Sequence, residues 1–158
     1  MFDLPADIQP TPVSFVKGKV TNLTGKPQAS IGKFIDLSNQ EVHSTFMTDS
    51  TTGEFMVFLP VGKDYSMNIS SKGHLFYSEI YQLKNETGKA IPLHAKLSPI
   101  EKGAKIELKN VFFETNQYNI KPESTSELND VVKFIQSNPN VSLEIGGHTY
   151  NAGKEIEN

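Results

Sequence analysis

The chain has 158 residues, enough for one domain or two small ones, and its hydrophobic content of 37% with 21% charged residues is typical of a folded globular protein. The net charge is −3 and all 15 basic residues are lysines, so the arginines that usually read phosphates and bases in nucleic-acid-binding proteins are absent. The lack of cysteine excludes disulfides, thiolate metal sites and cysteine nucleophiles.

The N-terminal residues carry no targeting or membrane-spanning signal. No apolar run in the chain approaches the roughly 18–20 residues of a membrane-spanning helix. The opening residues lack both the basic and the apolar region of a signal peptide, so an export signal would have to lie upstream of this sequence. Residues 1–12 contain three prolines and little periodicity, and we expect a linker or a lead-in strand there.

Residues 13–98 predict a β-sandwich of about seven strands. Short runs rich in β-branched and aromatic residues are separated by turn signals about every ten residues. The expected strands are 14–21, 29–37, 41–48, 54–59, 65–70, 75–83 and 91–97. The run 54–59 is apolar at successive positions, so we expect a central strand covered on both faces or a strand at a tight corner.

Residues 99–103 mark a linker, and residues 104–158 predict a partial α/β segment with the order strand, helix, strand. The segments 104–113 and 141–145 alternate as strands, and we expect them to pair through a right-handed crossover. Between them, Pro122 suits a first helical position, and Ser124 with Glu127 has the spacing of a capping box. Asn138-Pro139 should end the helix. The helix carries one apolar stripe, which comprises Leu128, Val131, Val132 and Ile135.

Several short motifs of the first domain resemble the carboxypeptidase regulatory-like, transthyretin-like β-sandwich family. They are Val16-x-Gly18-x-Val20, Thr52-Gly53-x-Phe55, Leu59-Pro60-x-Gly62-x-x-Tyr65 and Lys72-Gly73-His74. The resemblance implies a rigid spacer or an interaction module. The same residues have local structural reasons, because glycines permit positive φ in turns and the aromatic residues would fill the core.

The second segment resembles the first half of the C-terminal peptidoglycan-binding domain of OmpA-type proteins. The motifs are Phe112-Phe113-Glu114-Thr115-Asn116 at a strand end, Lys121-Pro122-Glu123 before the helix, Asn138-Pro139 after it, and Gly147-His148-Thr149-Tyr150-Asn151 after the second strand. A transthyretin-like domain before an OmpA-like domain looks like the large envelope proteins of the Bacteroidetes. The resemblance implies a non-enzymatic protein without a cofactor, on the periplasmic side of the outer membrane, which links that membrane or its complexes to peptidoglycan.

The resemblance also implies the ligand site, which would comprise Phe113, Asn116, Thr149, Tyr150 and Asn151. In the family, an Asp after the Thr and an Arg on the next helix grip the diaminopimelate of the peptide stem. Here Tyr150 occupies the Asp position, and a phenol with a pKa near ~10 is not an anion at neutral pH. The sequence stops before the Arg-bearing helix. We therefore expect this chain alone to bind the peptide stem weakly or not at all, and its incomplete domain could pair with a second copy or contact other envelope proteins.

A second interpretation stays open. The chain could be a protein- or carbohydrate-interaction β-sandwich whose C-terminal part is a degenerate remnant, and local turn capping remains an alternative role for Thr149 and Asn151. The four histidines are widely spaced and are expected at surfaces or turns rather than on a metal. Glu114 and Glu144 are expected to face solvent rather than to act as an acid–base pair, so no catalytic residue is predicted.

Overall fold

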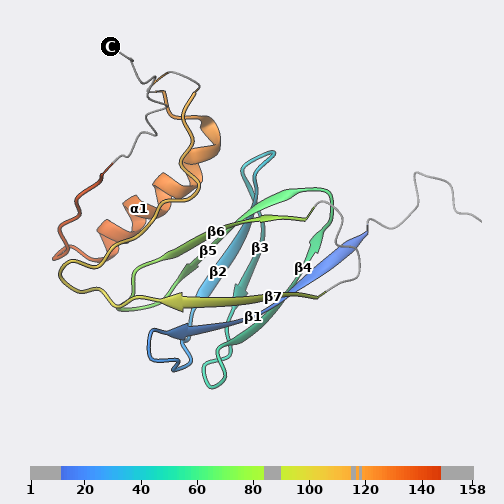
Figure 1. The fold of residues 1–158 in the computed structure, drawn as a ribbon, viewed down its shortest axis with the longest axis horizontal. Helices are drawn as coiled ribbons and strands as arrows, with labels where there is room; N and C mark the ends of the chain where they lie inside the picture. The colour runs from blue at the N-terminus through green and yellow to red at the C-terminus, as the bar shows by residue number, and fades with distance from the viewer. Residues whose placement is uncertain (1–11, 84–89, 115–116, 118, 147–158) are drawn as a thin grey trace, which may run out of the picture.

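The computed structural model describes residues 12–83, 90–114, 117 and 119–146. Within these ranges the chain forms seven strands in two sheets, followed by one α-helix (Figure 1). The strands lie within a few residues of the predicted ones, which confirms a mostly β fold. They are β1 (Val13–Asn22), β2 (Ile31–Asp36), β3 (Glu41–Met47), β4 (Glu54–Pro60), β5 (Asp64–Ser70), β6 (Tyr77–Gln82) and β7 (Ala90–Leu97).

The two sheets have the strand orders β4-β1-β7 and β3-β2-β5-β6. The four-stranded sheet is antiparallel throughout, whereas β1 is antiparallel to β4 and parallel to β7. Alternating apolar side chains from both sheets meet in one core, as the period of two in each strand requires. The largest side chains of this core with no measurable exposure are Phe34, Leu59, Tyr65, Met67 and Ile69.

Two glycines make room for an aromatic pair that joins the sheets. The rings of Phe46 on β3 and Phe55 on β4 are stacked, with centroids 4.1 Å apart and planes at 15°. A Cβ on Gly18 would collide with the Phe55 ring, and one on Gly32 would collide with the Phe46 ring. A glycine in the interior of a strand often marks such a close approach. Both glycines are therefore required by packing rather than by backbone angles.

The predicted environment of β4 is wrong. This strand lies at the edge of the three-stranded sheet and alternates regularly, with Phe55, Val57 and Leu59 buried. Met56 and Phe58 point outward and are 52% and 61% exposed. Their apolar character made the run look as if both faces were covered, whereas the outer face of this sheet is open at these two positions.

Strand β5, by contrast, is buried at five successive positions and is covered on both faces. Helix α1 (Thr125–Ser137), preceded by the short 3-10 helix η2 (Pro122–Ser124), lies over the outer face of the four-stranded sheet (Figure 1). Contacts from the helix reach Lys33 on β2, Asn68 on β5 and Ser78 on β6. Pro122 is the first residue of η2 rather than of α1, and α1 ends directly before Asn138-Pro139, as predicted.

The predicted strands around the helix do not form. Residues 104–108 and 141–146 have no ladder partner, and the only pairing in the described part of residues 104–146 is an isolated bridge between Phe113 and Ile120. Ala104, Ile106 and Leu108 are nevertheless half-buried, while the residues between them are exposed. The alternating pattern thus predicts one-sided burial correctly, but that side packs on the helix and the sandwich instead of pairing with a second strand.

The predicted capping box and apolar stripe are also wrong in detail. The Ser124 hydroxyl does not cap the helix; it bonds the Phe112 backbone, accepting from the N–H at 2.7 Å and donating to the carbonyl at 3.2 Å. Of the predicted stripe only Val131 is buried, whereas Val132 and Ile135 are 50% and 39% exposed. The helix is rotated so that Glu127, Val131 and Phe134 face the sandwich, because the strand pair that the stripe would have covered is absent.

Candidate functional site

The structure describes one of the five residues that the resemblance assigns to a ligand site. Phe113 lies in the loop before η2 and is 55% exposed. Asn116, Thr149, Tyr150 and Asn151 lie outside the described residues. The described chain instead points to the junction between α1 and the four-stranded sheet, which combines buried polar groups with a groove.

A polar joint fixes the helix to the sheet. Lys33 and Asn68 are direct partners on β2 and β5, and both side chains reach the carboxylate of Asp130 on α1. The Lys33 ammonium lies 2.6 Å from Asp130 Oδ1, and the Asn68 amide donates to Oδ2. Side-chain exposures of 24% for Lys33 and 13% for Asp130 show that this ion pair is partly desolvated. Such a pair contributes more to orientation than an exposed one, because a buried carboxylate needs its partners.

Glu127 is the most deeply buried charged residue of the joint, with 1% exposure. Its Oε2 accepts hydrogen bonds from Ser78 at 2.7 Å and from the Asn110 amide at 3.0 Å. Burial raises the pKa of Glu127, although the bonds from Ser78 and Asn110 partly oppose this. Within the described part of the chain, Glu127 Oε1 and Asn110 Oδ1 have no hydrogen-bond partner. Protonation of Glu127 would therefore add an O–H donor to a buried group that now contains two unpaired acceptor oxygens.

An apolar cluster continues the joint toward the end of the helix. Leu75 and Phe76, from the segment between β5 and β6, pack with Val131 and Phe134 of α1. The rings of Phe76 and Phe134 meet edge-on, with centroids 5.9 Å apart. This contact anchors the C-terminal half of α1, whereas the polar contacts anchor its first half.

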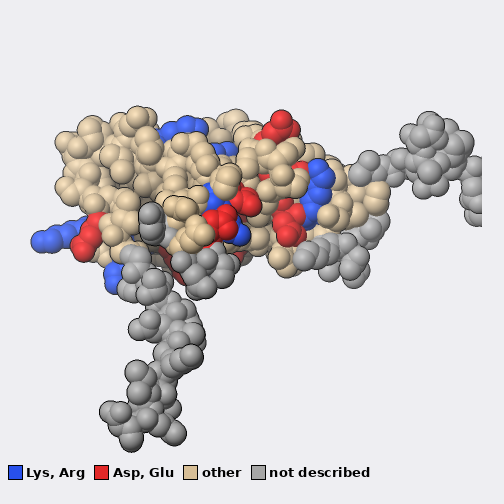
Figure 2. Space-filling view, turned by 90° about the horizontal axis from the view of Figure 1, so that it is seen from above, with Lys and Arg blue, Asp and Glu red and all other residues tan. Residues whose placement is uncertain are grey.

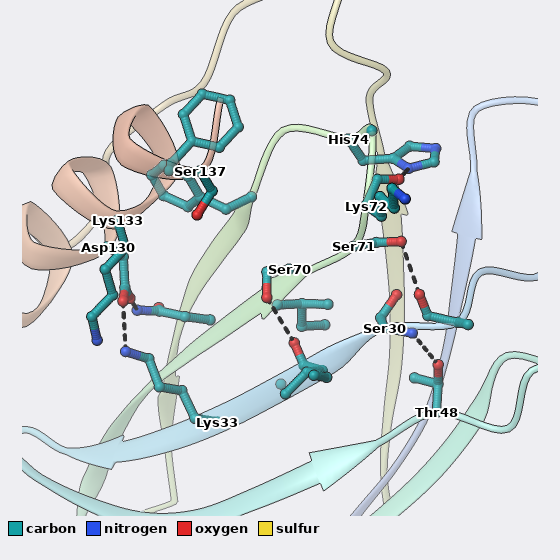
Figure 3. A pocket seen from close by; sticks show the side chains of 18 of the residues that line it. Ser30, Lys33, Thr48, Ser70, Ser71, Lys72, His74, Asp130, Lys133 and Ser137 are labelled. Carbon is teal, nitrogen blue, oxygen red and sulfur yellow. Dashed lines mark hydrogen bonds and ion pairs between the residues drawn. The ribbon is translucent and has the colours of Figure 1, made fainter. Parts of the chain in front are cut away.

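A groove of about 820 Å³ opens beside this cluster. Its lining comes from the start of β2 and the residues before it, the end of β3 and the turn that follows, the end of β5 and the turn that follows, and the C-terminal half of α1. Figure 3 shows Asp130, Lys133 and Ser137 on the helix side, with Lys72 and His74 on the opposite side. The hydroxyls of Ser70 and Ser71 donate to the carbonyls of Ile31 and Ala29, which pins the turn after β5 to β2.

The unpaired charges around the groove are positive. Asp130 is the acidic side chain among its described lining residues, and Lys33 and Asn68 already engage it. Lys72 and Lys133 are exposed and form no ion pair with any residue that the structure describes. His74 Nδ1 lies 3.1 Å from the Lys72 carbonyl oxygen, which holds the ring at the rim. On the face shown in Figure 2, by contrast, acidic and basic side chains are interspersed.

The histidines and carboxylates do not gather into a metal site within the described ranges. His94 Nε2 contacts the Thr21 hydroxyl at 3.1 Å on the opposite sheet, and His43 lies against the Tyr65 ring. Among residues 12–83, 90–114, 117 and 119–146, no helix is both long and apolar enough to cross a membrane.

Sequence reasoning missed Lys33, Asn68, Ser78 and Asn110. On β5, Ser66 and Asn68 alternate with apolar residues, a pattern that normally indicates a solvated outer face. The signal that was available is the acidic pair Glu127 and Asp130 on the predicted helix, because carboxylates one turn apart on a docking face need polar partners.

Neither a protein-family model nor a curated protein matches the chain. Among solved structures, it is similar to the Bacillus anthracis TIE protein, with a TM-score of 0.48 and 10% identity over 56% of this chain and 18% of that one. It is also similar to CueP (TM-score 0.42, 16% identity, 56% of this chain and 64% of that one). A third is the catechol 1,2-dioxygenase of Acinetobacter radioresistens (TM-score 0.46, 10% identity, 61% and 56%). The chain thus spans 18% to 64% of these solved chains, and likenesses this weak carry no inference about function.

Proposed function

We propose that this chain is part of a non-enzymatic, OmpA-type envelope protein that links the outer membrane or its complexes to peptidoglycan. The transthyretin-like β-sandwich would serve as spacer, and residues 104–158 would be the first half of the wall-binding domain. One observation carries the proposal: the motifs of residues 111–116, 121–123, 138–139 and 147–151 together resemble those of that domain. The helix boundaries support this assignment, since α1 lies between the second and third of these motifs.

The packing of α1 on the sandwich is compatible with this proposal because it leaves several apolar side chains exposed. Val132 and Ile135, which an OmpA-type sheet would cover, are exposed, together with Leu143 at 39% and Ile145 at 70%. The helix therefore keeps an apolar side available while its other side rests on β2, β5 and β6. We propose that the sheet of an OmpA-type domain would pack on that apolar side.

The proposal is tested by co-sedimentation with purified peptidoglycan sacculi. The chain as it stands should sediment weakly, because Tyr150 cannot supply the anion that pairs with the ligand's ammonium. Appending the second half of an OmpA-type domain and introducing Tyr150→Asp should raise retention by roughly 30-fold or more, the usual effect of restoring one buried ionic contact. Free diaminopimelate should then release the protein.

The matched control is the appended chain with Tyr150→Asn, which has the size of Asp without its charge. If the Asp and Asn versions sediment equally, or neither exceeds residues 13–98 alone, the wall-binding proposal is wrong.

A further inference from the structure

The groove beside α1 has the features of a binding site, and the residues that line it are different from those that the resemblance assigns to the cell wall. Its sheet side carries Ile31 and Met47, which are cross-strand partners and are 54% and 75% exposed. Two large apolar side chains that face outward over a groove form a surface that favours contact with apolar groups of a ligand. Phe134 continues this apolar surface onto the helix.

The charges at the rim select the ligand. Lys72 and Lys133 stand on the two sides of the groove, without acidic partners in the described part of the chain (Figure 3). The charge of Asp130 is already paired with that of Lys33, and its second oxygen accepts a hydrogen bond from Asn68. Asp49 lies next to the lining residues. Its carboxylate accepts hydrogen bonds from the backbone N–H groups of Thr51 and Thr52 in the turn after β3. The groove is therefore positive at its rim and apolar on its floor.

This combination fits a peptide better than a sugar. Carbohydrate sites use exposed aromatic faces with planar polar groups, whereas the two phenylalanines of the groove, Phe76 and Phe134, are each only 8% exposed. Aliphatic side chains on the floor suit the alternating side chains of an extended segment. A volume of about 820 Å³ lies within the range of ligand sites that enclose small organic molecules or short peptides.

We propose that the groove between α1 and the four-stranded sheet binds an extended acidic peptide with apolar side chains. Carboxylates of the peptide pair with Lys72 and Lys133, and its apolar side chains contact Ile31 and Met47. The ion pair of Lys33 with Asp130 lines the groove on the side of the helix. Binding is therefore sensitive to salt, as expected for exposed ionic contacts.

The experiment measures fluorescence anisotropy of a labelled hexapeptide, acetyl-Glu-Leu-Glu-Val-Glu-Leu, with the full chain at low salt. Two peptide controls separate the contributions: acetyl-Gln-Leu-Gln-Val-Gln-Leu removes the charge, and acetyl-Glu-Gly-Glu-Gly-Glu-Gly removes the apolar side chains. Both should bind less tightly than the parent peptide. Chemical-shift perturbation with the parent peptide should appear first at Ile31, Met47, Lys72 and Lys133.

Protein variants locate the site. The double variant Lys72→Glu, Lys133→Glu should weaken binding of the parent peptide roughly tenfold, the combined effect of losing two exposed ionic contacts. The matched control is Lys17→Glu with Lys102→Glu, which changes the net charge equally at two exposed lysines that do not line the groove. All four positions are exposed, so both variants should keep the circular dichroism spectrum of the parent.

Three results overturn the proposal. Equal binding of the Glu and Gln peptides would show that the rim charges select nothing. Equal weakening by the two double variants would show that net charge, and not the groove, attracts the peptide. Perturbations confined to the outer face of β4-β1-β7 would place the peptide on another surface.

Discussion

Lys33 on β2 and Asp130 on α1 are 97 positions apart in the chain, and their charged groups lie 2.6 Å apart. The pair fixes the position of α1 on the sandwich, because the Asn68 amide on β5 donates a hydrogen bond to the other oxygen of the same carboxylate. Because these partners come from three separate elements, the contact reports on tertiary docking rather than on local helix formation.

We predict that Asp130→Ala destabilises the chain more than Lys33→Ala does. Loss of Asp130 leaves the buried Asn68 amide and the Lys33 ammonium without a partner, whereas loss of Lys33 leaves Asp130 with Asn68. We expect about 2–3 kcal/mol for Asp130→Ala and about 1 kcal/mol for Lys33→Ala from urea unfolding. Lys133→Ala, an exposed lysine on the same helix, is the control and should be near neutral. Equal losses at Asp130 and Lys33 would argue against the shared carboxylate.

The second prediction concerns the pH dependence that Glu127 contributes. Its pKa in the folded chain is raised above the ordinary value of 4.5. The folded state therefore binds the proton more tightly than the unfolded state does. The resulting stabilisation is fully present below about pH 4.5 and is lost as the pH rises through the raised pKa. Replacing Glu127 with Gln should remove this dependence and raise the free energy of unfolding at pH 7 by about 1 kcal/mol.

Urea midpoints at a series of pH values from about 4 to 8 measure this effect. Glu144→Gln, at an exposed position, is the matched control for the charge change. If the difference between the Glu127→Gln variant and the parent does not vary with pH, the buried carboxylate does not titrate as the structure requires.

The third prediction is that Asp36 contributes a pH dependence of stability opposite to that of Glu127. Burial raises the pKa of Asp36, but the hydrogen bonds from Lys63 and Ser38 outweigh this, and the net pKa lies below the ordinary value of 3.8. Its contribution is therefore present above about pH 3.8 and is lost as the pH falls through the lowered pKa. Asp36→Asn should cost about 1–2 kcal/mol at neutral pH, and this cost should shrink in acid. Thermal melts at pH 7 and pH 3 test it, and a constant cost would contradict it.

The fourth prediction concerns Gly18. An added methyl group at this position meets the ring of Phe55, which is held in place by stacking on Phe46. Gly18→Ala should therefore lower the free energy of unfolding by about 1–3 kcal/mol through overpacking. Gly146→Ala, where nothing lies within 4 Å of the added carbon, should be close to neutral. A Gly18→Ala protein as stable as the parent would mean that the aromatic pair is not tightly constrained.

The strands could be predicted because their signals are local. Each expected run is rich in β-branched and aromatic residues, and glycines lie in the turns that bound the runs: Gly25, Gly53, Gly62 and Gly73 all have positive φ. Helix α1 was predictable for the same reason, since proline precedes it and Asn138-Pro139 ends it. These features depend on neighbours a few residues away.

The surroundings of each element could not be predicted in the same way. The alternation of residues 104–108 indicates which side is buried, but it does not say whether a strand or a helix covers that side. Ser66 and Asn68 look solvated in β5, and their burial depends on a helix more than fifty residues later in the chain. The groove has no local signal, because Ile31, Lys72 and Lys133 come from three distant segments.

The parallel pairing of β1 with β7 has a mechanical consequence. The two strands are aligned over eight residue pairs, from Phe15 with Ala90 to Asn22 with Leu97. The chain enters β1 at one end of this pairing and leaves β7 at the other. A pull on the two ends of the sandwich therefore slides the strands along each other and loads their hydrogen bonds together. A hairpin pulled from its open end would instead unzip one bond at a time. Separating β1 from β7 in this direction therefore requires many hydrogen bonds to break at once.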